Sequence, residues 1–243
     1  MVKRITSQGI AVIDGDSHLT KWVEESGRLD HDPMIRTLAD MIPPGTVAID
    51  AGASIGDHTF GYLKSRAAMV CAFEPNPVAF ECLVHNCNGV STGPVYDRPI
   101  IGMATCFNMA LGNEKGARFL RINAPNYGAS FIIDVVDLTM DDTVDTAPEI
   151  QVVTLDSIRL PYRVGFIKAD VEGYEGELLV GAHATIERDR PIICMEVNKG
   201  RLEANGSSPD QLLQALVDLG YNTRPVPGTA VHPLQWDVLA IPR

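Results

Sequence analysis

The stretch VAIDAGASIGDHTF, residues 47–60, constrains the fold more than any other part of the chain. It reads as a buried strand, a turn of small residues and the start of a helix, with Asp50 at the mouth of the turn. Gly52 and Gly56 allow the turn to bring its backbone close to another group. Such a strand, turn and helix are typical of a sheet whose strand ends hold a ligand. The stretch therefore predicts an α/β protein with a ligand at this turn.

Strands and helices alternate along the rest of the chain, as judged from apolar and amphipathic runs. The expected strands are residues 46–50, 69–75, 104–112, 164–170, 190–197, 221–226 and 235–241. The expected helices are residues 57–66, 78–88, 175–186 and 208–220. This alternation predicts a doubly wound, mostly parallel sheet with helices on both faces. No helix separates the last two strands, so one of them must run antiparallel to its neighbours.

The first 43 residues precede this alternating pattern. Residues 9–13 form a short apolar run, and Asp16 or Ser17 can cap a short helix after it. Asp32 and Pro33 then predict the start of a second helix, because Asp is a favourable N-cap and Pro suits the first helical position. We expect this N-terminal extension to form a lid or to contact the substrate.

Composition excludes several classes of protein. The formal net charge of the 243 residues is −11, which would repel DNA or a long RNA, so we expect no nucleic acid partner. No apolar run is long enough for a signal peptide or a membrane span, which predicts a cytoplasmic protein with no membrane partner. The five cysteines are odd in number and form no CxxC pair, which favours reduced thiols in the core.

The turn after the first strand differs from known phosphate-binding turns. Its pattern is D-x-G-x-x-x-G, whereas a dinucleotide fingerprint is G-x-G-x-x-G and a P-loop ends in Gly-Lys-Ser/Thr. A carboxylate at Asp50 would repel a phosphate and would suit a cationic ligand or an ammonium group. The turn is thus expected to hold a cofactor without a pyrophosphate. The predicted contacts are Asp50, Gly52, Ala53, Ser54 and Gly56.

A second acid lies at the end of the second strand. Glu74 follows the second glycine of the turn by 18 residues, close to where an acid binds a ribose diol in dinucleotide sites. Pro75 and Asn76 then adjoin the ribose or base, and Ala110 and Leu111 after the third strand flank an adenine. Helix capping would explain either acid alone. The two acids together favour S-adenosylmethionine, which has a ribose, an adenine, a sulfonium and an amino-acid end.

Acidic residues also gather after the fourth strand, in FIKADVEGYEGELL. Glu175 and Glu177 fall in the first turn of a helix, where acids are favourable without any function. Asp170 and Glu172 precede that helix, at the sheet edge where a methyl acceptor should lie. We predict that Asp170 and Glu172 are the catalytic residues, as acceptor contacts or as the base.

Taken in order, these stretches resemble the FkbM family of S-adenosylmethionine-dependent methyltransferases. The matching segments, within residues 47–197, are VAIDAGASIGDHT, AFEPNP, NMALGN, TLDSI, FIKADVEGYEGELLVGA and PIICMEV. The resemblance implies the class I methyltransferase fold, a seven-stranded Rossmann-like sheet with a reversed last strand. It implies one methyltransferase domain over 1–243, with its core at 44–243 and a hairpin or loop insert near 116–149. It also implies O-methylation of a hydroxyl on a small molecule, glycan or glycolipid.

Methyl transfer from a sulfonium requires that oxygen, methyl and sulfur be aligned, and a hydroxyl also benefits from a base. His58 is a weaker candidate for this base than the acids after the fourth strand, and Tyr174 is a weaker candidate for the acceptor pocket. Residues 127–130 can form a loop over the cofactor.

A divalent metal would need three acids, Asp170, Glu172 and Glu196, to converge. We expect no metal, because the usual cluster of several carboxylates with an Asn is not evident in the sequence.

Other functions remain open at this stage. An NAD-dependent oxidoreductase could use a similar sheet, but the acidic turn argues against it. A non-catalytic nucleoside-binding protein would have no need of the carboxylates after the fourth strand. A methyltransferase acting on nitrogen or nucleic acid is disfavoured by the net charge and by the absence of a D/N-P-P-Y/F motif.

Overall fold

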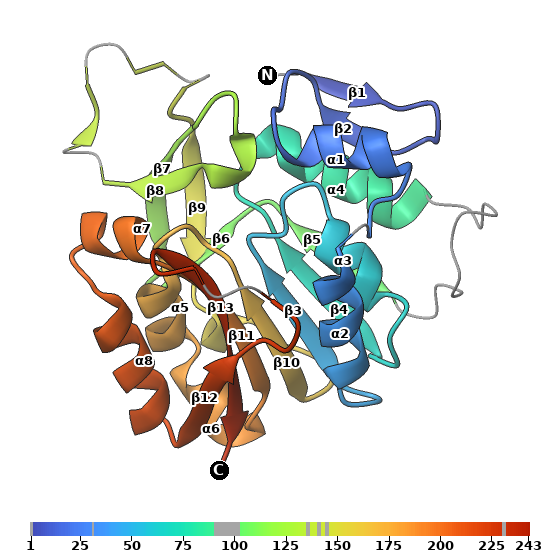
Figure 1. The fold of residues 1–243 in the computed structure, drawn as a ribbon. Coiled ribbons are helices and arrows are strands. Elements are labelled where there is room, and N and C mark those ends of the chain that lie inside the picture. Colours follow the sequence, from blue (N-terminus) through green and yellow to red (C-terminus); the bar gives the residue numbers. More distant parts are fainter. Residues whose placement is uncertain are drawn as a thin grey trace.

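The computed structural model describes residues 2–30, 32–89, 103–134, 137–139, 142–143, 146–229 and 232–243. The main sheet has seven strands: β3 Val47–Ala51, β4 Met69–Phe73, β5 Ala104–Phe107, β10 Val164–Ala169, β11 Ile192–Asn198, β12 Tyr221–Pro225 and β13 Gln235–Pro242. Their order across the sheet is β12-β13-β11-β10-β3-β4-β5 (Figure 1). The predicted α/β fold with a seven-stranded, mostly parallel sheet is confirmed.

Strand pairing fixes the direction of each strand. Parallel ladders join β11 to β10, β10 to β3, β3 to β4 and β4 to β5. β13 runs antiparallel to both of its neighbours, β11 and β12. The parallel ladders bring the carboxyl ends of β3, β4 and β10 to the same edge of the sheet, which is the edge expected to bind a ligand.

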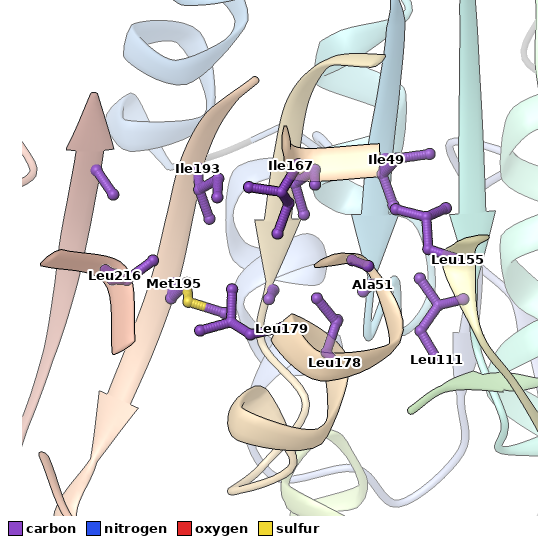
Figure 2. Packing of buried hydrophobic residues seen from close by; sticks show 14 of the residues in the cluster. Ile49, Ala51, Leu111, Leu155, Ile167, Leu178, Leu179, Ile193, Met195 and Leu216 are labelled. Atoms are coloured by element: carbon purple, nitrogen blue, oxygen red, sulfur yellow. The ribbon is translucent and has the colours of Figure 1, made fainter. Parts of the chain in front are cut away.

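Alternate side chains of these strands face two layers of helices. On one face, Ile49 and Ile167 pack in a cluster with Leu178 and Leu179 of α5, Glu175–Gly181 (Figure 2). The same cluster includes residues of α6, His183–Asp189, and α8, Pro209–Asp218. The opposite face packs against α2 Pro33–Met41, α3 Asp57–Tyr62 and α4 Pro77–Gly89. Helices therefore cover both faces, as the alternation of strands and helices predicts.

A second sheet lies beyond the carboxyl edge of the first. It contains β6 Ala110–Leu111, β7 Gly116–Arg121, β8 Phe131–Ile133 and β9 Glu149–Val153, in the order β6-β9-β7-β8. The single strand expected over 104–112 is therefore wrong, because it divides into β5 and β6 of different sheets. The break falls at Asn108, whose side-chain amide donates to the backbone oxygens of Glu74 and Pro75 at 2.9 and 3.1 Å.

The N-terminal segment forms a small unit packed on α4. Its strands, β1 Lys3–Ile5 and β2 Ala11–Ile13, pair as an antiparallel hairpin of which the sequence suggested only the second strand. The buried Asn86 of α4 bonds both the N–H and the C=O of Ala11. α1, Leu19–Ser26, follows the hairpin, and the Asp16 carboxylate accepts from the Thr20 N–H at 2.8 Å.

Helix boundaries show two further differences from the sequence expectations. The helix expected over 175–186 is two helices, α5 and α6, separated at Ala182. A short helix after β11, α7 Lys199–Ala204, was not predicted, and the Asn198 side chain caps it. α2 begins as predicted, with the Asp32 carboxylate accepting from the Met34 N–H. In the described part of the chain no helix has the length and apolar character to span a membrane. All five cysteines are free thiols.

Candidate functional site

Two neighbouring cavities lie at the carboxyl ends of β3, β4 and β10. The first, which we call the inner cavity, has a volume of about 50 Å³ and is narrow. The second, the outer cavity, has a volume of about 280 Å³. Both are lined by Gly52, Ser54, Gly128, Asp170 and Glu172, so the two cavities adjoin.

The turn after β3 forms one wall of the inner cavity. Gly52 has a φ of 78°, and a Cβ atom there would overlap the backbone oxygen of Asp170. The chain after β3 therefore passes so close to the end of β10 that only glycine fits. Ser54 has a φ of 49°, a left-handed conformation that is uncommon for a residue with a side chain. The turn is thus held in a fixed shape with its backbone facing the cavity.

Glu74, at the end of β4, fixes the same turn. Its Oε2 accepts from the Ser54 N–H at 2.8 Å and its Oε1 accepts from the Asn76 N–H at 2.7 Å. The side chain lines the inner cavity although Glu74 is only 7% exposed. Burial raises the pKa of Glu74 to about 7, although the two backbone hydrogen bonds act to lower it. Each carboxylate oxygen keeps a lone pair for a further donor, such as a hydroxyl of a ligand.

The other residues predicted to bind a cofactor divide into two groups. Pro75, Ala110 and Leu111 line the inner cavity together with Phe73 and Leu120. These apolar side chains suit a flat ring.

The second group lines neither cavity in the described part of the chain. Its members are Asp50, Ala53, Gly56 and Asn76. Asp50 is fully buried, and its Oδ2 accepts from the Thr59 hydroxyl at 2.5 Å. Burial raises the pKa of Asp50, and Lys168 opposes this only in part. The Asn76 side chain caps α4 by accepting from the Val78 N–H at 3.1 Å. In this structure these residues shape the turn, and their direct contact with a cofactor stays a prediction.

The loop expected to cover the cofactor does lie at the inner cavity. Tyr127, Gly128 and Ser130 line it, and Tyr127–Ala129 form one turn of 3₁₀ helix. The Tyr127 N–H donates to Asp16 at 3.2 Å, which ties the loop to the N-terminal segment. The small sheet and the β1–β2 unit thus meet above the main sheet (Figure 1).

An ion pair between a buried lysine and a partly exposed aspartate lies where the two cavities meet. Lys168, at the end of β10, is only 3% exposed and donates to the Asp170 Oδ2 at 2.8 Å. Burial alone would lower the pKa of Lys168, but the charges of Asp170 and Asp50 outweigh it and raise that pKa. Lys168 therefore remains an ammonium, and its hydrogen bond orients the carboxylate of Asp170.

Glu172 is held by an arginine that the sequence did not indicate. Its Oε2 accepts from the Arg201 Nε at 3.1 Å. Arg201 also donates to the backbone oxygen of Ala129 at 2.8 Å and lies 4.2 Å from the centre of the Phe131 ring. Burial and the nearby Asp170 raise the pKa of Glu172 to about 8 despite this pairing. Glu172 also has a left-handed φ of 53°, so the backbone is strained at a cavity wall, as is common at functional sites.

The far wall of the outer cavity is acidic. Glu196 of β11 and Asp237 of β13 are directly opposite each other in the antiparallel ladder, and both line the cavity. Glu196 Oε1 accepts from the Gln235 side chain at 2.6 Å, while its buried Oε2 has no hydrogen-bond partner. Burial, with repulsion from Asp170 and Glu172, raises the pKa of Glu196 to about 9. Burial raises the pKa of Asp237 to about 6.

The three acids that a metal would require do converge. One carboxylate oxygen from each of Asp170, Glu172 and Glu196 lies within 4.8 Å of the others. Each of these acids already bonds a protein group, respectively Lys168, Arg201 and Gln235. The expectation that no metal is used stays a prediction.

His58, the weaker candidate for the base, and Tyr174, the weaker candidate for the acceptor pocket, lie in different places. His58 lines the outer cavity, and its Nδ1 lies 2.9 Å from the hydroxyl of the buried Tyr62. Tyr174 does not contribute to the outer cavity, because its ring packs against Gly112 and Val152 of the small sheet. In this structure Tyr174 packs as an ordinary aromatic residue of the small sheet, and a contact with the methyl acceptor stays a prediction.

The chain matches the sequence model described as the Methyltransferase FkbM domain over residues 50–223. A search of curated proteins finds no match.

Among solved structures, the chain is similar to the methyltransferase FkbM from Methylobacillus flagellatus KT, with a TM-score of 0.53 and 16% identity. That alignment covers 93% of this chain and 60% of the other, so this chain spans about 60% of that relative's length. It is also similar to a precorrin-6y C5,15-methyltransferase from Geobacter metallireducens GS-15, with a TM-score of 0.46, 12% identity and coverages of 86% and 87%. A Streptococcus mutans protein in complex with SAH aligns with a TM-score of 0.48, 12% identity and coverages of 85% and 94%. The first likeness shows a shared fold.

Proposed function

The chain belongs to the FkbM methyltransferase family, and we propose that it transfers a methyl group from S-adenosylmethionine to a hydroxyl of a small molecule or glycan. The inner cavity would take the cofactor and the outer cavity the acceptor. The observation that carries the proposal is the carboxylate of Glu74 at the wall of the inner cavity, beside a glycine turn that presents backbone to the same space. The order of the strands and the antiparallel β13 further support a class I methyltransferase.

The residues of the inner cavity fit a nucleoside without phosphates. Glu74 offers acceptor lone pairs to a ribose diol, and Leu111 and Phe73 offer apolar walls to an adenine. No lysine or arginine lines the inner cavity among the described residues, so it lacks the cations that a pyrophosphate site commonly uses. The cavity is too narrow for a nucleoside as it stands, so the loop of Tyr127–Ala129 would move outward on binding.

S-adenosylmethionine, when bound, supplies a methyl group that a sulfonium has already activated. The protein then has to place the acceptor oxygen and exclude water. Asp170 suits contact with the acceptor hydroxyl, because Lys168 engages its Oδ2 and leaves Oδ1 for the substrate. In this role Asp170 accepts the hydroxyl proton. Glu172, whose pKa is about 8, is partly protonated at neutral pH and can donate as well as accept at the same boundary.

Calorimetric titration with S-adenosylhomocysteine, with NAD as the negative control, tests this proposal. We expect S-adenosylhomocysteine to bind and NAD to show no heat. Glu74→Gln should weaken S-adenosylhomocysteine by about tenfold or more, because a charge-assisted hydrogen bond to the ribose is lost. Glu149→Gln removes an exposed carboxylate from β9 and should leave the affinity unchanged. Binding of NAD in place of S-adenosylhomocysteine would favour an oxidoreductase, and equal affinities for both variants would remove the ribose assignment.

Methyl transfer to a panel of hydroxylated acceptors separates an enzyme from a protein that only binds nucleosides. We expect Asp170→Asn to abolish turnover and to retain the affinity for S-adenosylhomocysteine. A cytoplasmic location and a single domain over 1–243 stay predictions, as does the absence of nucleic acid and membrane partners.

A further inference from the structure

More carboxyl groups line the outer cavity than the proposed reaction requires. Its acidic lining residues are Asp32, Asp57, Asp170, Glu172, Glu196 and Asp237. Lys168 is the only lysine or arginine in the lining that the structure describes. A cavity with this balance favours a ligand with positive charge.

We propose that the methyl acceptor carries a protonated amine, and that the outer cavity binds this ammonium close to the hydroxyl to be methylated. The inference rests on the proposed function, since it assigns the outer cavity to the acceptor. It narrows the substrate class to amino alcohols and amino sugars, with one amine and at least one hydroxyl in reach of Asp170.

The charge of the cofactor does not account for these acids. Asp170 and Glu172 line both cavities and lie near any ligand of the inner one. Glu196 and Asp237 line the outer cavity and do not line the inner one. The Asp32 carboxylate caps α2 by accepting from the Met34 N–H, whereas the Asp237 side chain makes no such hydrogen bond within the described part of the chain.

With both carboxyl groups ionised, Glu196 and Asp237 are an unfavourable pair, which a cation would relieve. They are directly opposite in the β11–β13 ladder, where like charges destabilise a sheet. Glu196 Oε2 is also buried, with no hydrogen-bond partner among the described residues. A ligand cation between the two carboxylates would relieve the repulsion and satisfy this oxygen.

The spacing of the converging oxygens suits an ammonium group. One oxygen each of Asp170, Glu172 and Glu196 lie within 4.8 Å of one another. An ammonium with tetrahedral N–H bonds and N···O distances of about 2.8 Å places its three acceptors about 4.6 Å apart. Three oxygens within 4.8 Å of one another are close enough for one ammonium group to reach all three.

A divalent metal is the other cation that such acids can hold. Two features favour the amine. The Lys168 ammonium, which bonds Asp170 at 2.8 Å, would repel a divalent metal ion at the same carboxylate more strongly than a singly charged amine. The indole of Trp22, 42% exposed, lines the same cavity, and an aromatic face attracts organic ammonium ions.

The test uses protein saturated with S-adenosylhomocysteine, titrated at pH 7 with ethanolamine, with ethylene glycol and with MgCl₂. Ethanolamine joins an ammonium to a hydroxyl, and ethylene glycol is its neutral analogue, small enough for any acceptor pocket. Backbone amide shifts of Asp237 and Glu196 in NMR spectra report binding at the site. We expect ethanolamine to bind about tenfold more tightly than ethylene glycol.

The variant Glu196→Gln/Asp237→Asn should weaken ethanolamine by about tenfold and leave S-adenosylhomocysteine affinity within about twofold. Asp237→Asn alone should give a smaller loss in the same direction. The control Glu25→Gln/Glu149→Gln removes the same charge from exposed positions and should change neither affinity.

Equal affinity for ethanolamine and ethylene glycol would overturn the inference, as would the absence of ethanolamine binding to protein that holds S-adenosylhomocysteine. Magnesium that binds more tightly than ethanolamine and displaces it would assign the acids to a metal. Failure of S-adenosylhomocysteine itself to bind is a separate result, which would remove the proposed function and this inference with it.

Discussion

The inner and outer cavities adjoin at one sheet edge, yet they are built in different ways. The inner cavity is formed by backbone turns and apolar side chains at the ends of β3 and β4, and Glu74 is the acid that belongs to it alone. The outer cavity is formed by carboxylates that come from the N-terminal segment, α3, β10, β11 and β13. In the proposed function, the inner cavity recognises the cofactor by its shape and by the carboxylate of Glu74, and the outer cavity recognises the acceptor by charge. A cofactor common to a family suits the first arrangement, and an acceptor that differs between members suits the second.

The largest expected effect comes from the turn of the inner cavity. Gly52→Ala would place a Cβ against the backbone oxygen of Asp170 and would also require a positive φ. We expect the free energy of unfolding to fall by about 3 kcal/mol and S-adenosylhomocysteine binding to be lost. Urea unfolding and calorimetry measure the two effects. Gly176→Ala in α5 is the control, because nothing lies within 4 Å of its added Cβ. A Gly52→Ala protein with normal affinity would show that the turn does not shape the inner cavity.

Arg201 joins the two cavities and gives the next largest effect. Arg201→Met would leave the buried Glu172 without its cation and free the backbone oxygen of Ala129. We expect a loss of about 2 kcal/mol in stability and about tenfold in S-adenosylhomocysteine affinity, because the loop over the inner cavity loosens. The exposed pair of Lys199 and Glu203, 3.8 Å apart, provides the control variant Lys199→Met, for which we expect less than about 0.5 kcal/mol. Similar losses in both variants would argue against a role for Arg201 in the loop.

The acids of the outer cavity should give the protein without ligands an unusual pH dependence. The pKa values of Glu172, Glu196 and Asp237 in the folded state are about 8, about 9 and about 6, all above their ordinary values. The folded state therefore binds more protons than the unfolded state between about pH 4 and pH 9, so stability falls as pH rises through this window. Urea unfolding at pH 6 and pH 8 measures the slope.

Glu196→Gln removes one of these groups and should flatten that slope by on the order of 1 kcal/mol across the window. Glu149→Gln should leave it unchanged. A stability that rises from pH 6 to pH 8 in the unsubstituted protein would contradict the assignment of raised pKa values to the outer cavity.

The smallest effect is expected at Tyr174, which contacts neither cavity in the described structure. Tyr174→Phe keeps the ring that packs against Gly112 and removes only the hydroxyl. We expect S-adenosylhomocysteine and ethanolamine affinities to stay within about twofold. A larger change in ethanolamine affinity would show that the outer cavity extends as far as Tyr174.

The inner cavity could be predicted from the sequence more completely than the outer cavity. The strand, turn and helix around Gly52 are local, so the turn and the place of Glu74 at the next strand end were visible without a structure. The seven strands followed from alternation, and the missing helix between β12 and β13 indicated that one of these two strands is antiparallel. That the last strand is the reversed one was implied only by the family resemblance. The break at Asn108 was missed because it depends on hydrogen bonds to the distant Glu74 and Pro75.

The outer cavity was visible only in part. Asp170 and Glu172 were found because they follow a strand directly. Asp237 lies within β13 and its position depends on the pairing with Glu196, which the sequence does not specify. Arg201 is 29 residues from Glu172 in a helix that was not predicted, and no local signal links the two.

A crystal structure with S-adenosylhomocysteine tests the central claim most directly. The account predicts the ribose hydroxyls within hydrogen-bond distance of the Glu74 carboxylate, the adenine between the ends of β4 and β6, and the sulfur directed at the outer cavity. A ligand with its ribose away from Glu74, or bound outside the inner cavity, would contradict the account.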